Sequence, residues 1–499
     1  MNNGKVVKNS GRIEKYSEFL SKILASFLLM FLIYSCTRPL SGFHTFRQAQ
    51  TAWPVKWWIE NGFDPFNPVV PIKGLSHQTW ILELPLFQWL AYLLNQVTGL
   101  TPIAASRFLS LVFAMSVVAW FSKILAEISG FRQRWILLFF IMNPYFIYWS
   151  TTGLVDWLAF SCTLLGSELL LRSKNTSRVS NWLCLLIAYF FYVSACLTKP
   201  SHFIFALGAF LTLRAQQKNL EISRMFISFL PVLLPTVLSY LVWRNWSSSH
   251  YPQGDPRRIW SVTRENYSWY FGSLDQYKSV IGNLYAILER FTGGRWGVLI
   301  FLVTIIVFLS SNLNLMTKIG IPLVYFLYLL KLLNLNVVHN YYQIPILFSY
   351  GSVMILGFQK ICSVFPKHKK IRRPAVLFLA VLLFVTQIVG GEREQYIEMA
   401  KDREVAGASC LGAEKSRNLV TFQAEDPSVF YNCGLASFMI NIKNPDEMVV
   451  FSKEFKRYRL LYAESNNLAK SSYLLSSVSK NKLIRINGNW YRIVWLDLT

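Results

Sequence analysis

Apolar runs of roughly 15–20 residues recur along the first 390 positions of this chain, and they constrain its fold more than any other feature. A helix of that length crosses a hydrocarbon core about 30 Å thick. Only 15% of the residues are charged, whereas soluble domains carry about a quarter. The sequence therefore predicts a polytopic α-helical membrane protein with about eleven transmembrane helices.

The first apolar run follows a basic stretch, and no small-residue cleavage site comes after it. We expect residues 19–36 to be a retained first span with its basic end in the cytoplasm. Later spans are predicted at 104–127, 135–150, 157–171, 182–198, 201–213, 225–243, 297–310, 319–335, 341–357 and 374–390. The short loops between alternate spans are rich in Lys and Arg, which is typical of cytoplasmic loops.

These basic loops alternate correctly only if residues 81–98 do not cross the membrane. The segment carries Glu83 and Pro85 near its start, and we expect it to lie along the interface as a helix. Eleven crossings then place the C-terminus outside. The net charge of +24 is accounted for by these loops and by attraction to anionic lipid, rather than by nucleic acid.

Two domains are expected. Residues 1–390 form a transmembrane catalytic domain with exported loops at 37–103 and 244–296. Residues 391–499 form a small exported α/β or β-rich domain, because runs such as LVTF, MVVF, YRLLYAE and WYRIVWLDL alternate apolar and polar residues. This tail contains Cys410 and Cys433, and an oxidising compartment would permit a disulfide between them. The other cysteines lie in or beside spans, where small apolar filling is the default role.

The first exported loop concentrates polar residues among aromatic ones, unlike a simple linker. Arg47 and Lys56 can bind a phosphate, the first by its planar fork and the second as a point charge. Glu83, Asp64 or His44 can accept a proton from a hydroxyl group. The loop also contains Gln48, Gln50, Lys73 and His77. We interpret the cluster as a site, although any one of these charges could simply face water.

Three further residues lie at the expected outer ends of spans: Asp156, Lys199 and His339. A carboxylate at membrane depth is costly, so Asp156 is expected to have a partner or a function unless it is a solvated loop residue. With the first loop, these residues would surround one outward cavity. That arrangement suits a substrate with a lipid-phosphate headgroup at the interface.

Several motifs, in order, resemble those of family 39 bacterial membrane glycosyltransferases in the GT-C superfamily. HTFRQAQTA is similar to the family's H-x-W-R-Q-A-D-T-A stretch, and ELPLFQWLAYLLNQVTG followed by ASRFLS is similar to its next segment. NPYFIYWSTTGLVDWLAF, TKPSH and HNYYQIP resemble its later segments, the last containing Tyr341 and Tyr342. The matches span residues 41–346.

The resemblance implies a sugar transfer from a polyprenyl-phosphate donor to a lipid, glycan or protein acceptor, on the outer face of the plasma membrane of a bacterium. A carboxylate would deprotonate the acceptor, and basic residues would meet the phosphate that leaves. Among the residues of this chain, we rank Glu83 first as this base, Asp156 second and His44 third. The implied substrate-binding residues are Arg47, Gln48, Gln50, Lys56, Asp64, Lys199, His339, Tyr341 and Tyr342.

The sequence departs from the family at two positions. Gln50 stands where Asp is usual, which removes the most obvious base, and Val155 stands where Pro usually precedes Asp156. A member that binds carrier lipid without catalysis therefore stays open. A flippase or transporter of lipid-linked glycans, and a polymerase or ligase that acts on them, also stay open as alternatives. Polar groups of a transporter would recur inside the spans near mid-membrane, whereas here they cluster toward one face. The residues indicate no cofactor, and a divalent-metal requirement is undetermined.

Overall fold

The computed structural model describes residues 3–38, 45–70, 78–79, 81, 83–173, 178–218, 221–250, 282, 284–289, 292, 294–331, 343–364 and 381, and five tail strands within 419–497. The chain divides into two compact units. The helical unit comprises Met1–Cys36, Leu82–Phe87 and Arg107–Glu394. The second unit comprises Thr37–Ile81, Gln88–Ser106 and Gln395–Thr499.

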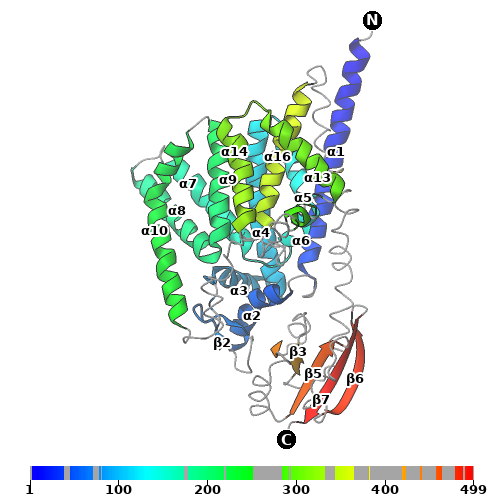
Figure 1. Ribbon diagram of the computed structural model, residues 1–499, viewed down its shortest axis with the longest axis vertical. Helices are drawn as coiled ribbons and strands as arrows, with labels where there is room; N and C mark the ends of the chain where they lie inside the picture. The colour runs from blue at the N-terminus through cyan, green and yellow to red at the C-terminus, as the bar shows by residue number, and fades with distance from the viewer. Residues whose placement is uncertain are drawn as a thin grey trace. The chain divides into compact units, whose positions relative to one another are not determined.

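The helical unit is built from apolar helices, most of them long (Figure 1). Their bounds are α1 (Asn3–Cys36), α4 (Pro102–Ser129), α5 (Gln133–Ile141), α6 (Pro144–Ser150), α7 (Asp156–Ser173), α8 (Arg178–Thr198), α9 (Pro200–Lys218), α10 (Ile222–Ser249), α13 (Arg295–Leu309), α14 (Leu315–Lys331) and α16 (Ile344–Val364). Within the described residues, five helices are long and apolar enough to cross a membrane: α1, α4, α8, α10 and α16.

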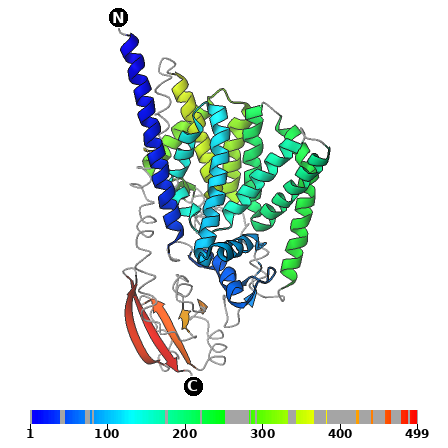
Figure 2. The same cartoon turned by 180° about the vertical axis from the view of Figure 1, so that it is seen from behind.

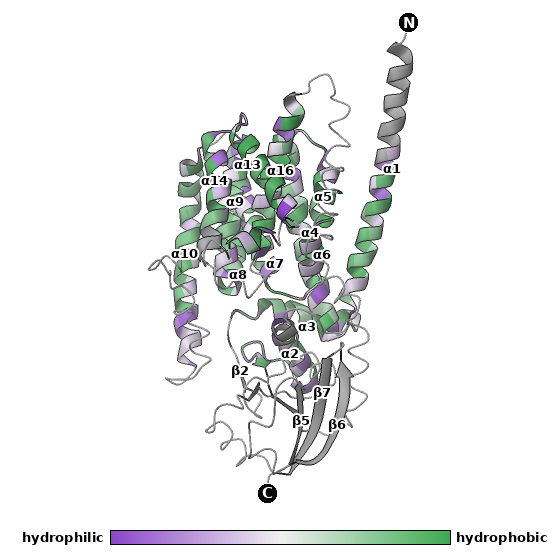
Figure 3. Ribbon diagram, turned by 45° about the vertical axis from the view of Figure 1, so that its right-hand side comes forward, coloured by the Kyte–Doolittle hydropathy of each residue, from purple (hydrophilic) through white to green (hydrophobic). Residues whose placement is uncertain are grey.

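Hydrophobic residues predominate along several helices of this unit, as the hydropathy colouring of the ribbon shows (Figure 3). Trp182 on α8, Val242 on α10 and Ile306 on α13 are each more than two-thirds exposed. Water would penalise such surfaces, whereas lipid tails solvate them. The chain is an integral membrane protein. The number of crossings stays a prediction, and the span predicted at 374–390 lies outside the described residues except for residue 381.

The segment predicted as a span at 135–150 forms two short helices, α5 and α6, rather than one, and its crossing of the membrane stays a prediction. The chain turns at Asn143, whose backbone is extended and whose side chain accepts hydrogen bonds from the backbone N–H groups of Tyr145 and Phe146. Pro144 follows as the first residue of α6, where its missing N–H costs nothing. An Asn cap followed by Pro is a local helix start.

An aromatic cluster forms the centre of the helical unit. The Phe348 ring of α16 lies 4.3 Å from the Phe121 ring of α4 and 5.0 Å from the Phe160 ring of α7, between ring centroids. α14 packs against both α9 and α16 (Figure 1 and Figure 2). At Gly357, α16 approaches α13 so closely that an added Cβ would lie 2.6 Å from a Thr304 methyl carbon.

Polar contacts join α4 to α7 at successive turns. The Ser116 and Ser161 hydroxyl oxygens are 2.8 Å apart, and the Trp120 indole N–H donates to the Glu168 carboxylate at 2.6 Å. Arg214 of α9 forms an ion pair with the same carboxylate and lies over the Trp120 ring. These contacts join α4, α7 and α9 to one another.

The second unit contains two helices, α2 (Thr45–Asn61) and α3 (Leu86–Thr98), the latter beginning in the helical unit, and the short antiparallel strands β1 (Val69–Val70) and β2 (Gln78–Thr79). α3 has 13 residues and spans about 20 Å, too short to cross a bilayer. Its helical structure agrees with the expectation for 81–98, and its interfacial position stays a prediction.

The tail forms a five-stranded sheet in the order β4-β3-β5-β7-β6. Its strands are β3 (Leu419–Phe422), β4 (Met439–Ile440), β5 (Arg457–Ala463), β6 (Val478–Ile486) and β7 (Asn489–Asp497). β3 pairs in parallel with β4 and β5, and β7 pairs antiparallel with β5 and β6. Three of the predicted strand runs coincide with β3, β5 and β7, whereas MVVF, Cys410 and Cys433 lie outside the described residues.

Candidate functional site

Asp156 is the first residue of α7 and is fully buried. The preceding turn, residues 151–155, is buried as well and is held by hydrogen bonds from the turn itself and from α4. The Thr152 hydroxyl donates to the Trp149 carbonyl at 2.9 Å, and the Ser110 hydroxyl of α4 donates to the Leu154 carbonyl at 2.9 Å. Gly153 adopts a positive φ of 61°, which a side chain would disfavour. The sequence thus places this carboxylate on a rigid support.

Two basic side chains from the junction of α8 and α9 meet the same carboxylate oxygen. The Nζ atom of Lys199 lies 3.8 Å from Asp156 Oδ1, and Nε2 of His202 lies 3.2 Å from it. All three side chains are buried or nearly so. Because an isolated buried carboxylate is costly, Lys199 and His202 stabilise Asp156 in the helical unit.

Glu83 belongs to the helical unit, in the short segment that leads into α3. The backbone N–H of the next residue, Leu84, donates to the carbonyl of Leu197, two residues before Lys199, at 3.1 Å. Glu83 itself is partly exposed. A second carboxylate is therefore carried by a segment bonded to the same α8 end as Lys199.

In the second unit, Arg47 and Gln50 lie one turn apart on α2. Arg47 donates from Nη1 to Gln50 Oε1 at 2.6 Å. Gln50 thus takes a hydrogen bond that an Asp could take, but it brings no negative charge. Its amide nitrogen is buried and has no hydrogen-bond partner among the described residues.

The other described candidates of the first loop also lie in the second unit. Lys56 lies over the Trp53 ring, 5.1 Å from its centroid, and Gln48 is buried. Asp64 is exposed and accepts at 3.3 Å from the backbone N–H of Phe66, which stabilises a tight turn. His44, His339, Tyr341 and Tyr342 lie outside the described residues.

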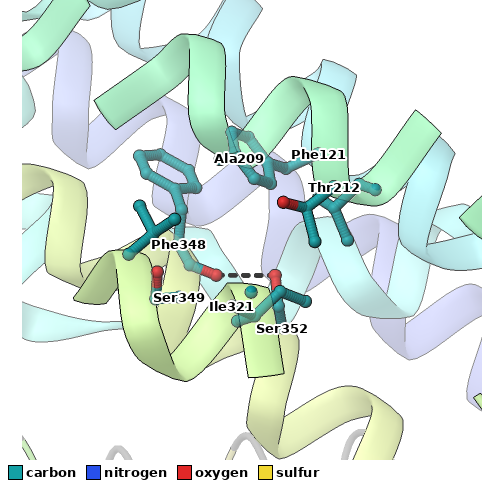
Figure 4. A pocket seen from close by; sticks show the side chains of 10 residues that line it. Phe121, Ala209, Thr212, Ile321, Phe348, Ser349 and Ser352 are labelled. Carbon is teal, nitrogen blue, oxygen red and sulfur yellow. Dashed lines mark hydrogen bonds between the residues drawn. The ribbon is translucent and has the colours of Figure 1, made fainter. Parts of the chain in front are cut away.

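A small pocket lies deeper in the helical unit, between α4, α9, α14 and α16 (Figure 4). Its cavity is about 10 Å³, enough for one water molecule. The hydroxyls of Thr212 and Ser352 donate to carbonyls of their own helices, and none of the ten lining residues is charged. This pocket is therefore a small gap in the helix packing.

Comparison with solved structures identifies the fold. The crystal structure of ArnT from Cupriavidus metallidurans bound to undecaprenyl phosphate aligns over 95% of this chain and 97% of its own, with a TM-score of 0.59 at 11% identity. The apo structure of the same protein aligns over 96% and 98%, with a TM-score of 0.57 at 12% identity. The chain shares the fold of ArnT.

This likeness confirms the many-helix membrane fold expected from the sequence, at the level of the fold that ArnT has. The family 39 subtype stays a prediction. An Archaeoglobus fulgidus oligosaccharyltransferase is less similar, with 9% identity, a TM-score of 0.47, and coverage of 87% of this chain and 67% of its own. The fold assignment rests on ArnT. Neither a protein-family profile nor a curated protein sequence matches the chain.

The ArnT-like helical unit brings together two of the sequence candidates, Asp156 and Lys199, and adds His202, which sequence reasoning missed. His202 lies in TKPSH, in the first turn of α9, three residues after Lys199, which stands between α8 and α9. A second basic side chain so close to Lys199 in the sequence was the signal that could have identified it.

Proposed function

We propose that this protein is a membrane glycosyltransferase that moves a sugar from a polyprenyl-phosphate donor to an acceptor hydroxyl, with Asp156 as the base. The single observation that carries the proposal is the buried carboxylate of Asp156, with two basic side chains on Oδ1, in a chain with the ArnT fold. ArnT has been crystallised with undecaprenyl phosphate, which supports the same class of carrier here.

Asp156 is favoured over Glu83 because of what surrounds it. Neither of its oxygens makes an aligned hydrogen bond within the described residues, although Lys199 and His202 approach Oδ1. A buried carboxylate in that state gains strongly from a hydroxyl donor such as an acceptor sugar or lipid. Glu83 is partly exposed, and we assign it to acceptor orientation.

In the proposed reaction, Asp156 takes the proton of the acceptor hydroxyl while that oxygen attacks the anomeric carbon. The bond from this carbon to the phosphate oxygen breaks, and the polyprenyl phosphate leaves with its electron pair. A single displacement of this kind inverts the anomeric centre. Arg47, with a neutral Gln50 beside it, is the proposed cation for the phosphate, since its planar fork suits phosphate oxygens.

The remaining assignments belong to the same proposal. Gln48, Gln50, Lys56, Asp64, Lys199, His339, Tyr341 and Tyr342 would contribute to substrate binding. Residues 1–390 would be the catalytic domain, in the plasma membrane of a bacterium with the N-terminus inside, and residues 391–499 an exported domain. The sugar would be a hexose or pentose, and the acceptor a lipid, glycan or protein.

Mass spectrometry of glycolipids and cell-surface glycans, with and without the gene, tests this function. The deletion strain should lack one glycosyl modification, and wild-type protein should restore it. Asp156→Asn at equal membrane abundance should not restore it. An unchanged glycan profile, with lipid-linked intermediates trapped on one side of the membrane, would instead favour a flippase.

A further inference from the structure

His202 contacts two partners through its two ring nitrogens. Nε2 lies 3.2 Å from Asp156 Oδ1, and Nδ1 lies 3.3 Å from the hydroxyl oxygen of Ser201. The imidazole is fully buried, whereas Ser201 is partly exposed. The three residues come from two helix starts, α7 and α9.

The Ser201 contact is consistent with one tautomer of the ring. When the hydroxyl donates to Nδ1, the proton of a neutral imidazole resides on Nε2 and faces the carboxylate. The polar N–H group then lies beside Oδ1, 3.2 Å away from nitrogen to oxygen, without adding another charge beside Lys199. Because the ring is enclosed by packed side chains, it can hold the carboxylate in one rotamer more firmly than a flexible Lys side chain can.

We infer that His202, oriented by Ser201, is a positioning residue for Asp156. This inference rests on the proposed function. His202 approaches Oδ1 with Nε2 at 3.2 Å, an electrostatic contact that restrains this oxygen, and Oδ2 is the oxygen that takes the proton of the acceptor hydroxyl. His202 exchanges no proton with the substrate.

The geometry separates this role from that of Lys199. Both side chains approach Oδ1, and neither ion-pair contact among the described residues involves Oδ2. Lys199 supplies charge at 3.8 Å, a distance at which direction matters little. The buried His202 ring approaches Oδ1 more closely, at 3.2 Å, and restrains where that oxygen can lie. Loss of the ring should therefore lower the rate of proton transfer while the affinity for the lipid carrier survives.

The test compares His202→Gln with His202→Leu in purified, reconstituted full-length protein. Gln retains an N–H donor near the position of Nε2, whereas Leu fills space without a donor. Transfer is followed with undecaprenyl-phosphate-linked hexose, pentose and aminosugar donors, and binding with undecaprenyl phosphate. His202→Leu should reduce kcat by about 10–100-fold, as loss of an orienting neighbour does elsewhere, with KM and carrier affinity unchanged. His202→Gln should recover most of kcat.

Ser201→Ala is the second variant. It tests the same inference if His202→Leu does not fold. It should reduce kcat several-fold, and Ser201→Thr should restore it because Thr keeps the hydroxyl. Wild-type kcat in a folded His202→Leu protein, or equal losses in the Gln and Leu variants, would overturn the role of His202.

Failure of the proposed function has a different signature. Absence of transfer by the wild type with every donor, or full transfer by Asp156→Asn, would remove Asp156 chemistry altogether. If Asp156→Asn is inactive while His202→Leu is fully active, only the positioning role of His202 is contradicted.

Discussion

Asp156 and His202 meet at 3.2 Å, Oδ1 to Nε2, although they are 46 residues apart in the sequence and both side chains are fully buried. The contact joins the first residue of α7 to the first turn of α9. It places an ionisable pair in the interior of an apolar bundle, where such groups are expensive. A role in function explains a buried ionisable pair at this position better than a role in helix packing does.

The base should be identified by isosteric replacement. We expect Asp156→Asn to reduce the chemical step by roughly 10²–10⁴-fold while undecaprenyl phosphate still binds. Glu83→Gln should cost less, since we assign Glu83 to orientation, and His44→Gln should cost least. Single-turnover kinetics with saturating donor measure each step. Near-normal turnover in all three variants would contradict acid–base catalysis at this site.

Arg47→Lys should weaken carrier binding and turnover substantially, because Lys lacks the planar fork that binds two phosphate oxygens. Gln50→Glu is the matched variant. It keeps an acceptor near Arg47 Nη1 but adds a negative charge, so it too should lower the affinity for undecaprenyl phosphate. Binding to reconstituted protein, measured at low and high salt, checks both. Wild-type affinity in Arg47→Lys would remove Arg47 from the site.

The ion pair between Arg214 and Glu168 should contribute mainly to stability. Both side chains are largely buried, and Trp120 donates to the same carboxylate. Glu168→Gln should destabilise the folded protein by about 3 kcal/mol, since it leaves the Arg214 cation without that charge. Arg295→Gln breaks a 4.0 Å pair whose Arg is 88% exposed, so its cost should be below about 1 kcal/mol. Thermal unfolding in detergent compares the two, and equal costs would contradict this assignment.

Topology can be tested with reporter fusions. Fusions after Lys218 and Lys370 should report the cytoplasm, and fusions within 255–275 or at the C-terminus should report the exterior, as the Lys and Arg distribution predicts. A cytoplasmic C-terminus would break the alternation and with it the interfacial assignment of 81–98.

Hydropathy was sufficient to predict the long helices. The predicted spans at 104–127, 182–198 and 225–243 match α4, α8 and α10 because lipid-facing helices are apolar along their whole length. The break between α5 and α6 was missed, since both halves are apolar and only Asn143–Pro144 marks the turn. Strand β6 was missed for the opposite reason: its sequence, VSKNKLIRI, is too charged to read as a strand. The Asn487–Gly488 dipeptide after it is a hairpin signal that could have indicated it.

The site was predictable only in part. Sequence placed Asp156 and Lys199 at matching ends of spans, but their contact depends on how α7 packs against α9. That packing is set by side chains distant in sequence, such as Trp120 and Tyr192, and no local pattern encodes it.

Release of polyprenyl phosphate from a polyprenyl-phosphate sugar tests the central claim most directly. Purified protein in liposomes is given undecaprenyl-phosphate-linked sugars and a crude envelope-lipid acceptor fraction, and free undecaprenyl phosphate and new glycolipid are measured by mass spectrometry. The wild type should produce both in equal amounts, and Asp156→Asn at equal abundance should produce about 10²–10⁴-fold less. Equal release by the two proteins, or no release by the wild type with any donor, would contradict the account.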